Sequence, residues 1–263
     1  MEINDLDGKG FEKIFELQKQ LMNFLVSKNK LNPYPVEINQ REGQKVLRDY
    51  LGYALEELSE AYTEYENLVI AYNENKPTEI PYILAKLNEE LSDSLHFFLE
   101  LTVFIGIEPE DFYHFYKTLA EEHDITASFI EGDLLESIIN ISQYENVKQK
   151  KMLPRHTYLR WDQQPYNHLI SAGRNISMEW GLVYSQELWY ITHNFFKTFN
   201  LLKSKPWREA GKETDEYQFK EAFMGCMKEL LCFYALIGFT PTGLFEAYVA
   251  KNKINIQRIK DKY

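Results

Sequence analysis

Apolar residues recur at intervals of three and four along most of the chain, and this spacing is the strongest constraint on the fold. Over residues 11–28 they mark one face of a helix, at Phe11, Ile14, Leu17, Leu21 and Leu25. Breaking residues are scarce, with 12 Gly and 9 Pro among 263 residues, which favours long helices over many turns. No segment alternates as a strand should. The sequence therefore predicts an all-α fold, a helical bundle.

The same periodicity, interrupted at Pro- and Gly-containing breaks, divides the chain into helices. We expect them over residues 11–28, 43–73, 82–106, from there to about 122, 166–203, 215–237 and 242–259. A length of 263 residues suits one large domain. We describe that domain, 1–263, as a first half (about 1–122), a variable helical and loop insert (about 123–165) and a second half (about 166–263).

The bulk composition excludes several classes of protein. A net charge of −11 argues against a nucleic-acid-binding surface, which needs clustered Lys and Arg. No uncharged apolar run approaches 18 residues, so no membrane span is expected. Cys226 and Cys232 form neither a zinc pattern nor a disulfide framework and are expected to be reduced. The acidic N-terminus lacks a signal region, so we expect a cytoplasmic protein.

Two pairs of acidic residues stand beside apolar stripes. Glu57 and Glu60 are three residues apart in one predicted helix, and Glu90 and Asp93 are three apart in the next. Residues i and i+3 face nearly the same way on a helix, so each pair lies at the margin of a buried face. If the two helices pack side by side, we expect the four carboxylates to converge.

Converging carboxylates repel one another unless protons or cations neutralise them. Oxygen ligands suit Mg²⁺, or Mn²⁺, and Mg²⁺ commonly joins one or two carboxylates to substrate phosphates. The alternative is that acids three apart simply decorate a solvated face. We assign that solvated role to five other glutamates, Glu56, Glu64, Glu66, Glu89 and Glu100.

A short internal echo raises the possibility of two related helical halves. The segments IGIEPEDFYHFY (105–116) and IGFTPTGLFEAY (237–248) share Ile, Gly, Pro and Tyr at the same offsets. The offset of 132 residues places Ala222 and Gly225 opposite Glu90 and Asp93. The second half therefore lacks the acids of the first.

The C-terminal stretch YVAKNKINIQRIKDKY carries a polar pattern at helical spacing. Lys251, Asn255 and Arg258 are separated by four and three residues and so share a face. Two cations and an amide can bind a phosphate and a base or sugar. A frayed polar terminal helix is the alternative interpretation.

Taken in order, E-x-x-E, E-x-x-D-x-x-H-F and K-N-x-x-N-x-x-R-x-x-x-x-Y resemble motifs of the all-α nucleoside triphosphate pyrophosphatases. Within that superfamily the chain is similar to the dimeric dUTPases and their phage dCTPase/dUTPase relatives. The matching residues are Glu57, Glu60, Glu90, Asp93, His96, Phe97, Lys251, Asn252, Asn255, Arg258 and Tyr263, with Gln18 of LQKQL matching the first helix.

The resemblance implies a homodimer and a reaction. Water attacks the α-phosphorus of a deoxynucleoside triphosphate, and pyrophosphate leaves. Glu57 would position or deprotonate that water, and Glu57, Glu60, Glu90 and Asp93 would bind Mg²⁺. Cations Lys251 and Arg258 would hold phosphates, and the nucleoside would be addressed by Gln18, His96 and Asn255, with Tyr263 closing the motif.

The pattern departs from the family at two places, Lys262 before the terminal tyrosine and a segment after the first acid pair that has Tyr in place of Trp. The motifs therefore do not identify the nucleobase of the substrate. We expect dUTP first, with dCTP or a modified pyrimidine as the alternative. An inactive helical protein that binds a partner is the alternative from another class.

Overall fold

The computed structural model describes residues 10–122, 137, 178–205, 207–208, 211–236 and 241–261. Over these residues the regular structure is helical and contains no sheet, which confirms the all-α prediction. The helices are α1 (Gly10–Ser27), α2 (Arg41–Asn73), α3 (Ile80–Ile105), α4 (Pro109–Glu122), α7 (Met178–Phe199), α8 (Glu216–Leu236) and α9 (Pro241–Asp261). The predicted insert, residue 137 excepted, and the helix start expected at 166–177 lie outside the described residues.

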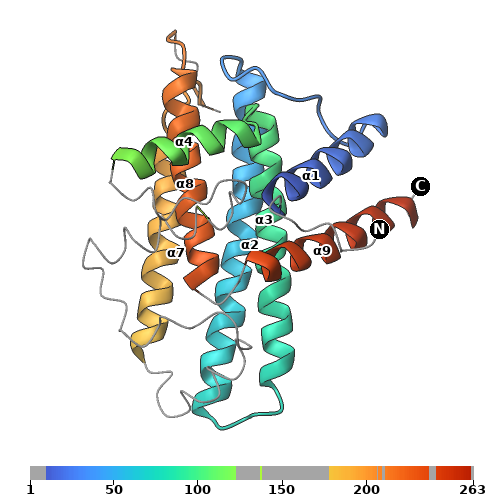
Figure 1. Ribbon diagram of the computed structural model, residues 1–263, viewed down its shortest axis with the longest axis vertical. Coiled ribbons are helices and arrows are strands. Elements are labelled where there is room, and N and C mark those ends of the chain that lie inside the picture. The colour runs from blue at the N-terminus through green and yellow to red at the C-terminus, as the bar shows by residue number, and fades with distance from the viewer. Residues whose placement is uncertain are drawn as a thin grey trace.

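Two long hairpins form the body of the molecule (Figure 1). Helices α2 and α3 run antiparallel along its length, and α7 and α8 pair beside them. The short helix α4 crosses one end of the bundle and contacts α1 and α8. On the side away from α7, α1 and α9 lie next to each other across α3, so residues from both ends of the chain meet there.

Helix α3 ends where the sequence supplies a residue without a side chain. Gly106 has φ +73°, a left-handed conformation that costs glycine little. Its N–H donates to the carbonyl of Val103, and the N–H of Ile107 donates to Thr102. A Cβ at Gly106 would also lie 3.1 Å from the Cβ of Pro35, so the tight turn into α4 depends on glycine here.

The interior between the hairpins is rich in aromatic rings. Phe195 of α7 is fully buried and stacks on Phe98 of α3 with 4.5 Å between ring centroids. It also meets Phe223 of α8 edge-on at 5.8 Å. Aromatic pairs of this kind add to the free energy gained from apolar burial, so Phe195 ties the two hairpins together.

None of the helices in the part of the chain that the structure describes combines the length and apolarity needed to cross a bilayer.

Candidate metal centre

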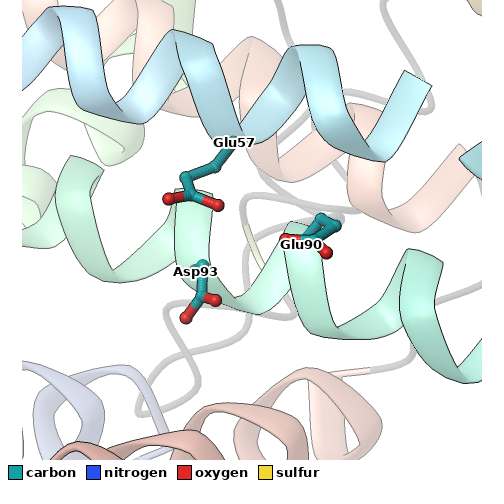
Figure 2. Close-up of side chains that lie close together, drawn as sticks. All are labelled: Glu57, Glu90 and Asp93. Carbon is teal, nitrogen blue, oxygen red and sulfur yellow. The ribbon is translucent and has the colours of Figure 1, made fainter. Parts of the chain in front are cut away.

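Three carboxylates meet between α2 and α3. Each of Glu57, Glu90 and Asp93 offers one oxygen, and these oxygens all lie within 4.8 Å of one another. Figure 2 shows Glu57 reaching from α2 toward α3, which carries the other two. All three side chains are half-buried. The structure therefore brings three of the four predicted acids to one place, and the cluster could hold a metal ion.

The helical spacing and the hairpin packing explain why these acids converge. Leu58 of α2 and Leu91 of α3 are buried, and the acids next to them in sequence stand at the edge of the same interface. Antiparallel packing then faces the two edges toward each other. Because side chains at the edge of a helix interface keep partial contact with water, the acids can approach without full burial.

Burial raises the pKa of every member of the cluster, and the neighbouring carboxylates add to the effect at Glu57 and Glu90. Burial and the carboxylates of Asp93, Glu60 and Glu90 raise the pKa of Glu57 to about 7. Burial, Glu60 and Asp93 raise the pKa of Glu90, and burial raises the pKa of Asp93. A divalent cation would relieve this repulsion, and three carboxylates are a donor set suited to a hard cation.

Glu60 lies at the rim of this cluster. Its side chain is exposed, and it does not join the three converging oxygens. Its charge still raises the pKa of Glu57 and of Glu90, so it stands close to both. Three residues turn a helix by about 300°, which sets Glu60 some 60° from Glu57 toward solvent.

Helix α9 supplies a cation to the other side of Asp93. The Nζ of Lys251 lies 2.6 Å from Asp93 Oδ2 and 2.9 Å from Glu89 Oε1. Burial lowers the pKa of Lys251, but the two carboxylates raise it above its usual range. Lys251 was predicted to hold phosphates. In this structure Lys251 forms an ion pair with one oxygen of Asp93, so a metal ion bound by Asp93 would share that carboxylate with Lys251.

The remaining C-terminal residues follow the predicted face of α9. Arg258 is exposed, and its charge lowers the pKa of Glu89, so it lies on the acidic side of the helix. Asn255 is half-buried and Asn252 is buried. Tyr263 lies outside the described residues.

Gln18 and His96, predicted to address the nucleoside, lie inside the protein. Gln18 has no exposed surface and His96 is 4% exposed. The amide oxygen of Gln18 lies 3.0 Å from His96 Nδ1 and accepts from the hydroxyl of Tyr248 at 2.6 Å. The rings of His96 and Tyr248 stack at 4.2 Å. Burial lowers the pKa of His96 to about 3, so the ring is neutral. Both residues join α1, α3 and α9 and are not exposed to a ligand in this conformation.

Glu100 completes this internal network, and its predicted solvated role is wrong. It is 7% exposed, and one carboxylate oxygen accepts from the amide nitrogen of Gln18 at 3.1 Å. Seven residues separate it from Asp93, so it shares the inward stripe of α3, and α1 covers it. Burial raises the pKa of Glu100 to about 8. The seven-residue spacing was the sequence signal for this position.

An aromatic face begins one helical turn from the acids and was missed as part of the site. Tyr53 precedes Glu57 by four residues and Phe97 follows Asp93 by four, and their ring centroids are 5.6 Å apart. Tyr53 is 47% exposed, and Tyr50 packs behind both rings. Spacing of four residues on both acid-bearing helices was the signal that could have found it.

Comparison of the chain with protein-family models, with curated proteins and with solved structures found no match. The functional argument therefore depends on the residues and their geometry.

Proposed function

We propose that this protein is a Mg²⁺-dependent pyrophosphohydrolase of pyrimidine deoxynucleoside triphosphates, with dUTP as the first candidate substrate. The observation that carries the proposal is the convergence of Glu57, Glu90 and Asp93 within 4.8 Å. On α9, Lys251 pairs with Asp93, and the charge of Arg258 lowers the pKa of that carboxylate. Carboxylates next to cations are what a metal–triphosphate complex requires on its two sides.

Glu57, Glu90 and Asp93 would hold the metal, with Glu60 at the rim. When bound, Mg²⁺ would neutralise negative charge on the phosphate chain and on the attacking and leaving oxygens. Arg258 is free to reach a phosphate oxygen from the exposed side of α9. Lys251 would exchange part of its contact with Asp93 for a phosphate oxygen.

Glu57 is the group best placed to accept a proton. It is the one carboxylate of the cluster that α2 contributes, and it faces the two acids of α3 across the site (Figure 2). The water oxygen forms a bond to the α-phosphorus while its proton passes to the Glu57 carboxylate. The bond from the α-phosphorus to the bridging oxygen breaks, and that oxygen leaves with the electron pair as part of pyrophosphate. The other product is the nucleoside monophosphate.

The aromatic face of Tyr53 and Phe97 favours a nucleotide, rather than inorganic polyphosphate, as the substrate. A half-exposed ring beside a phosphate site gives a base a surface on which to stack. Stacking is tolerant of base identity, so this face supports a nucleoside without choosing between uracil and cytosine.

The test is pyrophosphate release from a panel of deoxynucleoside triphosphates, with Mg²⁺ and with EDTA. We expect Mg²⁺-dependent release with a preference for dUTP, and a loss of about 100-fold or more in kcat for Glu57→Gln. Glu66→Gln is the matched control, because it neutralises an exposed carboxylate of the same helix. Turnover of Glu57→Gln at the wild-type rate would refute the assigned role. Preference for dCTP would select the alternative substrate, and absence of turnover with every nucleotide would favour a protein that binds a partner.

We also propose a homodimer, as the family resemblance implies. Exposed aromatic side chains on α7, Trp189 at 71% and Phe196 at 55%, support a surface that is covered in solution. Light scattering at micromolar concentration tests this, and a monomer mass would refute it.

A further inference from the structure

A pocket at the start of α2 gathers positive charge in a chain whose net charge is −11. The cavity measures about 170 Å³ and its lining contains four basic side chains and two neutral polar ones: Arg41, Lys45, Arg48, Lys205, Gln44 and Ser204. Arg41 and Lys45 are exposed at the mouth, and Arg48 and Lys205 are half-buried. Lys45 contacts Asp49 at 3.0 Å, and neither that residue nor any other acid is among the lining residues.

The wall of the pocket is fixed by hydrogen bonds between α2 and the segment that follows α7. Gln44 is 2% exposed, and its side-chain oxygen accepts from the N–H of Ser204 at 2.9 Å. An Nη of Arg48 donates to the carbonyls of Leu202 and Ser204 at 3.2 and 3.3 Å. The backbone of Lys205 pairs with that of Arg208, and its Nζ donates to Asn200 Oδ1 at 2.9 Å. The two inner cations, Arg48 and Lys205, are therefore arranged before any ligand binds, which reduces the entropy lost on binding.

One hydrogen-bond donor in the basic pocket lacks an acceptor. The Nε of Arg48 is buried and has no hydrogen-bond partner among the described residues. Burial lowers the pKa of Arg48, and burial together with the charges of Arg48, Lys203 and Arg208 lowers the pKa of Lys205. These side chains repel one another and lose hydration in the pocket. A polyanion would reverse both effects, because its charge offsets the repulsion and its oxygens accept the hydrogen bonds.

This pocket is separate from the metal centre. Arg48 precedes Glu57 by nine residues of α2, which is about two and a half turns and roughly 13 Å along the helix axis. Two and a half turns place the two side chains on opposite faces of the helix. A ligand in the pocket therefore would not share its contacts with the acids.

We propose that this pocket is a binding site for phosphate groups, distinct from the metal centre. The phosphate can come from inorganic phosphate or pyrophosphate, or from the phosphate chain of a nucleotide. Arg48 and Lys205 form the inner contacts, and Lys45 adds charge at the mouth. This proposal does not depend on the proposed hydrolase activity.

The test is isothermal titration calorimetry of the full chain with pyrophosphate, inorganic phosphate and dUTP in separate runs. EDTA keeps divalent cations out of the metal centre, and the ionic strength is held constant with NaCl. We expect saturable binding of at least one of these anions. Arg48→Gln should weaken it by about tenfold or more, since a charge-assisted contact is lost, and Lys45→Gln by a few-fold.

Lys86→Gln is the matched control, because it removes one half-buried surface cation far from the pocket. Lys86 pairs with Glu64, which lies 16 residues or about 24 Å beyond Arg48 along α2. Binding by this variant should equal the wild type. Arg48→Gln also removes contacts to the carbonyls of residues 202 and 204, so its melting temperature is compared with the wild type. If it does not fold, the exposed Lys45→Gln variant decides the question.

Absence of saturable binding at millimolar concentration would overturn the proposal. So would binding that Lys45→Gln, Arg48→Gln and Lys86→Gln leave equally strong, since that pattern is non-specific attraction. Binding of dUTP alone, weakened in the two pocket variants, would support the proposal and identify a nucleotide as the ligand. Comparable binding of pyrophosphate would support the proposal and identify the free anion as the ligand. None of these outcomes requires hydrolysis, so the binding result stands whether or not the protein shows the proposed hydrolase activity.

Discussion

The two hairpins of the bundle share a packing plan and differ at their margins. In α2 and α3 the edge of the interface carries the acids Glu57, Glu90 and Asp93. In α8 the positions 132 residues after Glu90 and Asp93 are Ala222 and Gly225, and both line an open groove between α7 and α8. The positions that the internal sequence similarity pairs with Glu90 and Asp93 therefore carry small side chains, whereas α3 carries charge.

The difference teaches that the interior and the margin of a helix pair are under separate physical control. Interior positions in both hairpins are large and apolar, and Phe98, Phe195 and Phe223 meet across them. The acids at the margin of α2 and α3 are only half-buried, and a half-buried side chain keeps contact with water, so charge is tolerated there. Four variants test this separation, and they follow in order of expected effect.

The largest effect should come from the shared interior. Phe195→Ala removes a fully buried ring that contacts both hairpins, and we expect it to lower the free energy of unfolding by about 3–5 kcal/mol. Urea denaturation measures the change. Tyr82→Ala, at a position 65% exposed on α3, is the control and should cost far less. Equal losses for the two variants would show that Phe195 does not join the hairpins.

The next effect concerns the carboxylate buried under α1. The folded-state pKa of Glu100 is about 8 against an ordinary value of 4.5, so the folded protein binds the extra proton. The contribution of this group to stability is complete below pH 4.5 and is lost as the pH rises through 8. Glu100→Gln removes this dependence. Its stability relative to the wild type should rise by on the order of 3 kcal/mol between pH 5 and pH 8.

Urea titrations of both proteins across that pH range measure the relative stability of Glu100→Gln. Other titrating groups cancel in the difference. A constant difference would mean that Glu100 is ionised in the folded state.

The third variant tests the charged margin. Asp93→Asn removes one of the converging carboxylates, and we expect Mn²⁺ affinity to fall by about 100-fold or more, or about 2.8 kcal/mol. Calorimetry or the electron paramagnetic resonance signal of free Mn²⁺ measures binding. Glu221→Gln, on α8 of the other hairpin, should bind as the wild type does. Comparable loss in both variants would place the metal elsewhere.

The smallest effect concerns the cation that shares Asp93. Because Lys251 Nζ lies 2.6 Å from Asp93 Oδ2, it competes with a metal ion for that carboxylate. We expect Lys251→Met to bind Mn²⁺ roughly threefold to tenfold more tightly. Lys253→Met, an exposed lysine of the same helix, should leave Mn²⁺ affinity unchanged. Weaker Mn²⁺ binding by Lys251→Met would show that the lysine supports the site.

Most of the described fold followed from local pattern. The predicted helix at 43–73 is α2, Arg41–Asn73, and the one predicted at 82–106 is α3, Ile80–Ile105. The directions of Glu57, Glu90 and Asp93 on their helices also followed, because an i, i+3 pair has a fixed direction. Their convergence required α2 to pack against α3, which the structure shows. Burial of Gln18 and Glu100 did not follow. The seven-residue spacing gives the direction of Glu100 on α3, but which helix covers that direction depends on α1 packing against α3.

By itself, the sequence determined where helices form and which side chains share a face, because both depend on backbone geometry over a few residues. It thereby placed the two acid pairs at the margins of α2 and α3. Only the tertiary structure decided that Glu60 stays at the rim, that Lys251 pairs with Asp93 and that four cations surround the pocket beside Ser204. Lys251 and Asp93, and likewise Arg48 and Ser204, are more than 150 positions apart in the sequence. The distances between them are set by how whole helices pack, which no local pattern encodes.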